Sequence, residues 1–297
     1  MGKKPIQLQD AYQVFMLEIQ SRKYTASTIE FYRCRLTAFL AWCAEQQTVH
    51  LGDVTPAILR GYFIHLQERG LVDYSVNAAA RAIKAFLNFC VDEELIVASP
   101  MRKVTTPKIA KRILPAFTPD DIKKLLGVCE TERDRAVVLF LLDTGLRAQE
   151  FIKLNGGDID IKVGTVAVHE GKGQKDRTCY FGAKARKALL RYYLQRGTPG
   201  EKEPIWLTER EQTRITQSGL NQLLQRLGKK AGVKDCKPHT FRRTFALWSL
   251  RNGMNIYALA RIMGHTDIAI LRQYLALVDG DAKAAHDQHG AVDNMMD

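Results

Sequence analysis

The chain has 297 residues, of which 46% are hydrophobic, so it is long enough to bury a core in about two domains. Lys and Arg number 44 against 32 Asp and Glu, and the resulting net charge of +12 favours a polyanionic partner. The longest apolar run, Ala136 to Leu142, is too short to cross a bilayer, and six scattered cysteines without a C-x-x-C pair indicate reduced thiols in a cytoplasmic protein with no membrane attachment.

Four amphipathic helices are predicted in the first hundred residues. The clearest start signals are a capping box, in which Ser27 and Glu30 satisfy each other's backbone groups, and Thr55 followed by proline at the first helical position. Short helices with apolar inner faces form bundles, so residues 1–100 are expected to be one helical domain. The expected helices cover residues 8–23, 27–43, 55–70 and 75–93.

A basic segment follows this domain at residues 101–115. It contains no acidic residue, and two prolines prevent a continuous helix. We expect an extended linker that lies along a phosphate backbone, although charged linkers also extend by self-repulsion and a plain tether remains the alternative. The candidate contacts are Arg102, Lys103, Lys108, Lys111 and Arg112.

A second domain is predicted over residues 116–297, beginning with a helix capped by Thr118. Alternating apolar and polar residues around two glycine-containing turns predict a small antiparallel sheet at residues 158–181. The fold class is therefore mostly α with a small antiparallel β-sheet (α+β). Further helices are expected at residues 133–144, 219–232, 238–252, 255–264 and from 267 onward.

The positive charge is concentrated in this second part. Residues 1–105 hold 12 basic and 10 acidic residues, whereas the remainder holds 32 and 22. Ordinary solubilising charge is the alternative explanation.

Six polar residues occur in local contexts that suit one phosphate-attacking site. Each alone has a simpler structural explanation: a helix-start cation, a turn lysine, a polar helix stripe or a half-buried aromatic. These structural explanations do not account for the order in which the six residues occur together. They are Arg147 in TGLRAQE, Lys172 in GKGQKDR, His239 and Arg242 in HTFRR, His265 in MGH, and Tyr274 in RQYL.

This order and spacing resemble the tyrosine recombinase family, the phage-integrase and Xer-type site-specific DNA recombinases. The resemblance covers nearly the whole chain and is strongest over residues 118–277. It implies catalytic roles for the six residues, with Tyr274 as the nucleophile and Glu150 as the acidic neighbour of Arg147. It also implies an N-terminal, SAM-like core-binding domain and a C-terminal catalytic domain that form a C-shaped clamp around DNA. One departure is Leu271, where many members have threonine.

The chemistry of these residue types agrees with that assignment. The guanidinium groups of Arg147 and Arg242 can neutralise the non-bridging phosphate oxygens, and Tyr274 can hold the cut strand as a phosphotyrosine without ATP. Lys172 on a hairpin can protonate the leaving 5′-oxygen. His239 can act as acid and base while His265 donates a hydrogen bond to the phosphorane. No metal or other cofactor is expected.

We therefore expect a site-specific recombinase that cuts and rejoins double-stranded DNA through a covalent 3′-phosphotyrosyl intermediate and a Holliday junction. Integration or excision of a mobile element and resolution of dimers both fit. The resemblance implies a nucleoid-associated homotetramer on DNA, with accessory factors that set direction. Further DNA contacts are expected from Lys175, Arg177 and Arg243.

Three other functions are alternatives to this expectation. A type IB-like topoisomerase shares the chemistry, and a catalytically inactive DNA-binding regulator would keep the fold. A metal-dependent nuclease is disfavoured because the carboxylates near the histidines form no repeated motif, and His286 with His289 is more typical of a polar tail. Residues 278–297 could dock on a neighbouring protomer or form a disordered tail.

Overall fold

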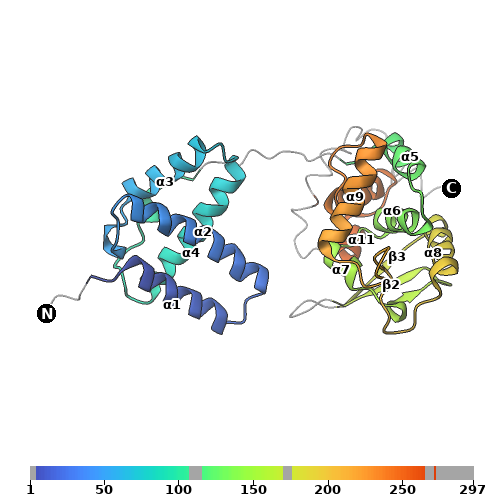
Figure 1. Cartoon of the computed structure of the whole chain (residues 1–297), viewed down its shortest axis with the longest axis horizontal. Coiled ribbons are helices and arrows are strands. Elements are labelled where there is room, and N and C mark those ends of the chain that lie inside the picture. Colours follow the sequence, from blue (N-terminus) through green and yellow to red (C-terminus); the bar gives the residue numbers. More distant parts are fainter. Residues whose placement is uncertain (1–4, 107–115, 170–175, 265–270, 272–297) are drawn as a thin grey trace, which may run out of the picture. The chain divides into compact units, whose positions relative to one another are not determined.

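The chain folds into two compact units, residues 1–112 and 113–297 (Figure 1). The computed structural model describes residues 5–106, 116–169, 176–264 and 271. Helices dominate both units, and the second unit also contains a three-stranded antiparallel sheet. The expected fold class is confirmed. Within the described ranges, none of the helices combines the length and apolar character that a membrane span requires.

The first unit is the expected bundle of four helices. Its core is closed by fully buried side chains such as Leu36, Phe39, Ile83 and Phe86, and the ring of Phe15 makes an edge contact with Phe86 at 5.6 Å between centroids. The helices are α1 (Leu8–Ser21), α2 (Ala26–Glu45), α3 (Pro56–Glu68) and α4 (Asp73–Asp92), with a short 3-10 turn, η1 (Leu51–Asp53), before α3.

The expected capping box at Ser27 is wrong. The N-cap of α2 is Thr25, whose backbone is extended (ψ 151°) and whose hydroxyl accepts a hydrogen bond from Thr28 N at 3.3 Å. Glu30 instead pairs with Arg33 at 2.8 Å. The cap expected at Thr55 is confirmed, because its hydroxyl accepts from Ile58 N.

The basic segment is not extended at its start. Residues Pro100–Lys103 form a 3-10 turn, η2, and Met101 is buried in the core of the first unit. Arg60 Nη2 donates to Lys103 O at 2.8 Å, which ties this turn to α3. Arg102 and Lys103 are exposed, as a DNA contact requires. Lys108, Lys111 and Arg112 lie outside the described residues.

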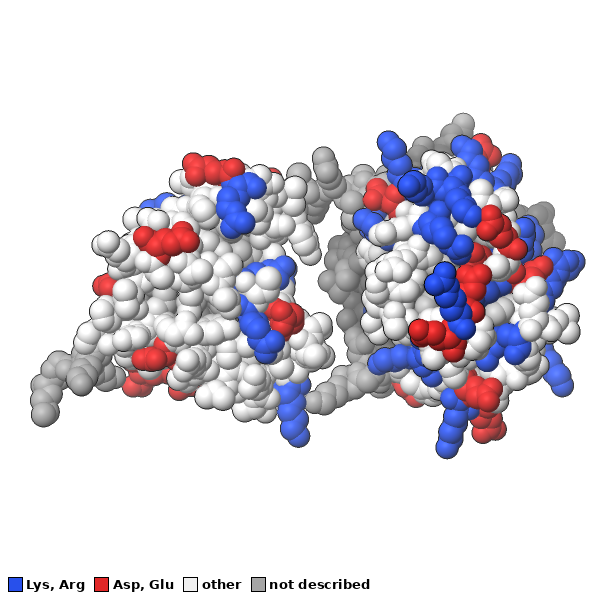
Figure 2. All heavy atoms as spheres, viewed as in Figure 1, with Lys and Arg blue, Asp and Glu red and all other residues white. Residues whose placement is uncertain are grey.

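The second unit is built around α6, a buried helix. Strand order in the sheet is β1-β2-β3, and Val166 pairs with Cys179 on its buried face. Figure 2 shows that, in that view, the second unit carries more basic side chains than the first. Its elements are α5 (Pro119–Gly127), α6 (Glu132–Thr144), α7 (Ala148–Lys153), η3 (Gly156–Asp158), β1 (Ile159–Asp160), β2 (Thr165–Val168), β3 (Arg177–Tyr180), α8 (Ala183–Arg196), α9 (Gln217–Ala231), α10 (Pro238–Arg251) and α11 (Ile256–Met263).

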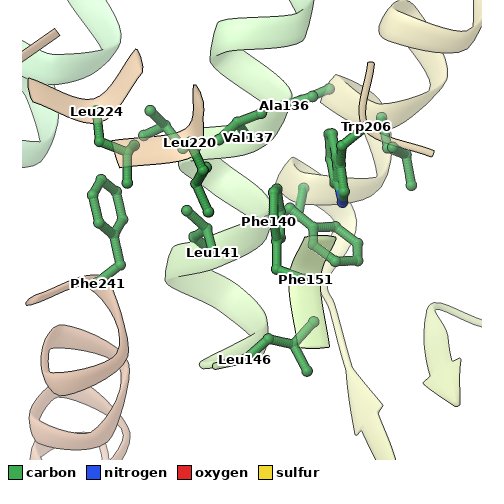
Figure 3. Packing of buried hydrophobic residues seen from close by; sticks show 14 of the residues in the cluster. Ala136, Val137, Phe140, Leu141, Leu146, Phe151, Trp206, Leu220, Leu224 and Phe241 are labelled. Carbon is green, nitrogen blue, oxygen red and sulfur yellow. The ribbon is translucent and has the colours of Figure 1, made fainter. Parts of the chain in front are cut away.

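Aromatic packing fixes α7 to this core (Figure 3). The buried ring of Trp206 stacks on Phe151 of α7 with 4.4 Å between ring centroids, and Phe140 of α6 meets it edge-on at 5.4 Å. Trp206 also stacks on Tyr192 of α8, with 5.8 Å between centroids. Because α7 is only six residues long, these contacts determine where its first residues lie.

The start of the second unit anchors α10. Phe117 N donates to the Thr244 hydroxyl at 2.9 Å, and Trp248 Nε1 donates to Phe117 O at 3.0 Å. The Phe117 ring also contacts Phe241 edge-on at 4.9 Å between centroids. The backbone and the ring of Phe117 therefore both fix α10, the helix that bears His239 and Arg242.

The position of the α2 cap can be tested by comparing Thr25→Ala with Ser27→Ala. We expect Thr25→Ala to destabilise the helix start by about 1 kcal/mol, because it removes the side-chain acceptor, and Ser27→Ala to have a smaller effect. Amide hydrogen exchange of peptides from the first turn of α2 measures both. A larger effect from Ser27→Ala would contradict the observed cap.

Candidate active site

Three arginine side chains meet at the carboxyl end of α11. Arg147 Nη2 donates to Gly264 O at 2.8 Å, and Arg242 Nη2 donates to Met263 O at 2.6 Å. Arg177 Nε donates to Ile262 O at 2.8 Å. The last carbonyls of a helix have no partner within it and form the negative end of its dipole, so guanidinium groups bind there favourably. Residues far apart in sequence are thereby fixed around one helix end.

The end of α6 contributes to the same cluster. Gly145 terminates α6 in the left-handed conformation (φ 60°), and a Cβ at this position would collide with the Phe245 ring. Gly145 O accepts from Arg242 Nη1 at 2.7 Å. These hydrogen bonds hold the guanidinium of Arg242 between the carboxyl ends of α6 and α11, and Arg242 is only 4% exposed there.

Glu150 balances this concentration of positive charge. Its carboxylate accepts from Arg147 N and Arg147 Nη1, both at 2.7 Å, and from Arg177 Nη2 at 2.8 Å. Burial alone would raise the pKa of Glu150, but the hydrogen bonds from Arg177 and Arg147 outweigh it and lower the pKa below its ordinary value. Glu150 is therefore ionised at neutral pH.

Arg242 stays protonated despite its surroundings. Burial, followed by the charge of Arg147, lowers its pKa to about 10, while Glu150 acts in the opposite direction. This value is still well above neutral pH. The site therefore keeps the cationic groups that binding of a phosphate requires.

His239 lies one turn before Arg242 on α10 and is exposed. Partial desolvation of the ring, followed by the charges of Arg243 and Arg242, lowers its pKa. A neutral imidazole can accept a proton at neutral pH.

The remaining predicted catalytic residues, Lys172, His265 and Tyr274, lie outside the described residues, as does Lys175. The continuous described range stops at Gly264, the residue before His265. Leu271 is also described, and it is fully buried in a hydrophobic cluster that includes Leu247 and Leu259. That burial gives the departure from the family pattern at Leu271 a packing role.

The prediction that Arg177 contacts DNA does not fit its position. Only 8% of its side chain is exposed, and it is engaged with Glu150 and Ile262 O. Arg243 is half-buried on α10. Sequence reasoning also missed the carbonyls of residues 262–264, which no side-chain pattern could indicate.

His169 is a second residue that sequence reasoning missed. It follows β2, and its ring lies between two carboxylates, with Nδ1 2.9 Å from Asp176 and Nε2 3.4 Å from Asp158. The hydrogen bond with Asp176 is the main cause that raises the pKa of His169. Among the residues that the structure describes, no three His, Cys, Asp or Glu side chains are grouped so that they could hold a metal ion.

The sequence matches two family descriptions. Residues 115–280 match the phage integrase family, and residues 13–94 match the N-terminal SAM-like domain of phage integrases. The chain therefore belongs to the phage integrase family.

Its curated relatives include tyrosine recombinases of the Xer group. XerC of Bacillus licheniformis is 30% identical over 266 residues, which cover 85% of this chain and 86% of the relative. XerC of Roseiflexus castenholzii is 28% identical over 280 residues, covering 90% and 88%, respectively. XerA of Thermococcus kodakarensis is 26% identical over 272 residues and 91% of each chain.

Solved structures show the same fold. A lambda integrase dimer bound to a COC′ core site superposes with a TM-score of 0.75 at 15% identity, covering 94% of this chain and 79% of that one. The Tn1549 transposon integrase in complex with transposon right end DNA gives 0.76 at 18% identity, covering 94% and 98%.

The pKa of His239 should lie below 6.5 in the free protein. We expect an NMR titration of its ring protons to have a midpoint below that value, and Arg243→Gln to raise the midpoint because it removes a nearby positive charge. Since folding lowers this pKa, the protein should lose stability as the pH falls from 6.5 towards the folded value. Arg251→Gln, at the far end of α10, is the control. A midpoint at or above 6.5 would show that the site does not keep His239 neutral.

Proposed function

We propose that the chain is a site-specific DNA recombinase that breaks and rejoins double-stranded DNA through a 3′-phosphotyrosyl bond to Tyr274. The observation that carries this proposal is the meeting of Arg147 and Arg242 on adjacent carbonyls at the end of α11. Two guanidinium groups fixed side by side suit the non-bridging oxygens of one phosphodiester. The names of the Xer relatives and the DNA in the integrase complexes support the same conclusion.

Arg147 and Arg242 have different surroundings, and we assign them different electrostatic roles. Arg147 has 37% of its side chain exposed and can reach a phosphate directly. Arg242 is buried and supplies a fixed charge whose effect is stronger in a low-dielectric setting. Neither arginine has to reorganise when negative charge develops, because rigid helix ends hold both.

In the cleavage step, the Tyr274 oxygen attacks phosphorus and its proton passes to neutral His239. The bond from phosphorus to the 5′-oxygen breaks, and Lys172 protonates that oxygen. The products are a 3′-phosphotyrosyl bond and a free 5′-hydroxyl. In the rejoining step, a 5′-hydroxyl of the partner strand attacks, its proton returns to Lys172, and Tyr274 leaves with the proton held by His239.

His265 donates a hydrogen bond to the phosphorane in this scheme. No metal, cofactor or ATP enters it, because the arginine charges neutralise the phosphate and the phosphotyrosyl bond conserves the energy of the broken one. We further propose that four protomers assemble on two DNA sites, with accessory factors setting direction. The exposed side chains of Arg102 and Lys103, with the basic residues up to Arg112, Lys175 and Arg243, are the proposed backbone contacts.

The test is covalent capture of DNA. Denaturation-resistant protein–DNA adducts are recovered from cells, the DNA is sequenced, and nicked suicide substrates are made from the enriched site. We expect wild-type protein to form an adduct and Tyr274→Phe to form none. Arg147→Ala should cleave roughly a hundred-fold or more slowly, because loss of such a donor raises the barrier by about 3 kcal/mol.

Lys123→Ala, which removes an exposed positive charge from α5, is the control and should cleave normally. An adduct formed by Tyr274→Phe would refute the proposed nucleophile. Wild-type protein that binds the site without forming an adduct would indicate an inactive regulator. Supercoil relaxation without exchange between two sites would indicate a topoisomerase.

A further inference from the structure

We infer that Arg177 is a positioning residue that holds Glu150 and the carboxyl end of α11, and thereby Arg147 and Arg242, in a single geometry without contacting DNA. This inference rests on the proposed function, because it takes Arg147 and Arg242 to be the phosphate-binding groups. It assigns to Arg177 a role in the rate of strand cleavage and none in DNA affinity.

The first connection runs through Glu150. Arg177 Nη2 donates to Glu150 Oε2, while Arg147 Nη1 donates to Glu150 Oε1 and Arg147 N to Oε2. The side chain of Glu150 is 10% exposed. Its carboxylate bridges the buried Arg177 on β3 and the more exposed Arg147 at the start of α7. Without Arg177, the hydrogen bonds that the structure describes for Glu150 would come from Arg147 alone, so the carboxylate would lose its connection to β3 and hold Arg147 less firmly.

The second connection runs through α11. Arg177 Nε and Cys179 Sγ both donate to Ile262 O, at 2.8 and 3.3 Å. The next two carbonyls, of Met263 and Gly264, hold Arg242 and Arg147. Successive carbonyls of one helix end are rigidly linked, so fixing Ile262 fixes the acceptors of both phosphate-binding arginines.

Arg177 is itself well placed to be a rigid support. It is the first residue of β3, and it pairs in register with Val168 of β2. With 8% of its side chain exposed, it has little surface to offer to a DNA backbone. Sites held by elements of a sheet keep their geometry better than sites held by loops.

The charges around Glu150 predict a change in its pKa when Arg177 is removed, which a loss of packing alone would not produce. Its carboxylate faces Arg147 from α7, Arg177 and Cys179 from β3, and Arg242 from α10, while α11 contributes only backbone carbonyls to this cluster. Burial raises the pKa of Glu150, and the hydrogen bond from Arg177 is the largest of the effects that lower it. Loss of Arg177 should therefore raise this pKa, and protonation of Glu150 would then release Arg147.

The experiment compares Arg177→Gln, Arg177→Lys and the control Lys123→Gln, which removes the same charge from an exposed site on α5. DNA affinity is measured against salt concentration, and single-turnover cleavage of the suicide substrate is measured against pH. We expect Arg177→Gln to bind with an unchanged salt slope but to cleave roughly a hundred-fold more slowly, as misplacement of catalytic groups by about 1 Å does. Its deficit should grow as the pH falls, because Glu150 then becomes protonated.

Arg177→Lys should restore part of the rate, since its ammonium can pair with Glu150 but cannot span both partners. Glu150→Gln should be non-additive with Arg177→Gln, because both break the same bridge. A salt slope reduced by about one with unchanged cleavage would identify Arg177 as a phosphate contact and overturn the inference. Unchanged cleavage with an unchanged slope would overturn it as well.

A separate measurement keeps the inference distinct from the proposed function. NMR of the arginine side chains in the DNA-free protein should show an Nη signal of Arg147 that is protected from exchange, and Arg147→Lys assigns it. This signal should be lost in Arg177→Gln and kept in Lys123→Gln. If wild-type protein forms no DNA adduct, the proposed function fails while this NMR result still decides whether Arg177 holds Arg147. Retention of the signal in Arg177→Gln would overturn the inference even in an active enzyme.

Discussion

The second unit depends on how one helix ends. At the end of α11, guanidinium groups bind three successive carbonyls: Arg177 binds that of Ile262, Arg242 that of Met263 and Arg147 that of Gly264. The same hydrogen bonds that satisfy these backbone groups also position the two arginines that we propose bind the phosphate. The left-handed Gly145 at the end of α6 makes the close approach of α10 possible, because a Cβ there would collide with the Phe245 ring.

The arrangement collects like charges, and Glu150 makes it tolerable. Three guanidinium groups near one another repel, and burial, followed by the charges of Arg147 and Arg177, lowers the pKa of Arg242. One carboxylate, bonded to two of the three, offsets part of it. Glu150, the acidic neighbour of Arg147, is thus an electrostatic requirement of the cluster, and Arg147 and Arg177 share it as their acceptor.

Sequence reasoning predicted the features with local signals. Thr118 caps its helix in a reciprocal box with Asp121, and Gly232 and Gly264 end theirs in the left-handed conformation. It missed α8, although the buried residues of that helix recur at helical spacing: Ala185, Ala188, Leu189, Tyr192 and Tyr193. It chose Ser27 over Thr25 because both are good caps. It could not foresee the role of Arg177, since Glu150 lies 27 positions away and Ile262 contributes only a carbonyl.

The buried, nearly solvent-free guanidinium of Arg242 links substrate binding to the stability of the fold. In the free protein, the repulsion among the arginines opposes folding of this region. An anion that enters the cluster removes part of that repulsion, and any ligand that binds only the native state shifts the folding equilibrium towards it. Binding of a phosphodiester by this cluster would therefore also stabilise the helices around Arg242 against unfolding.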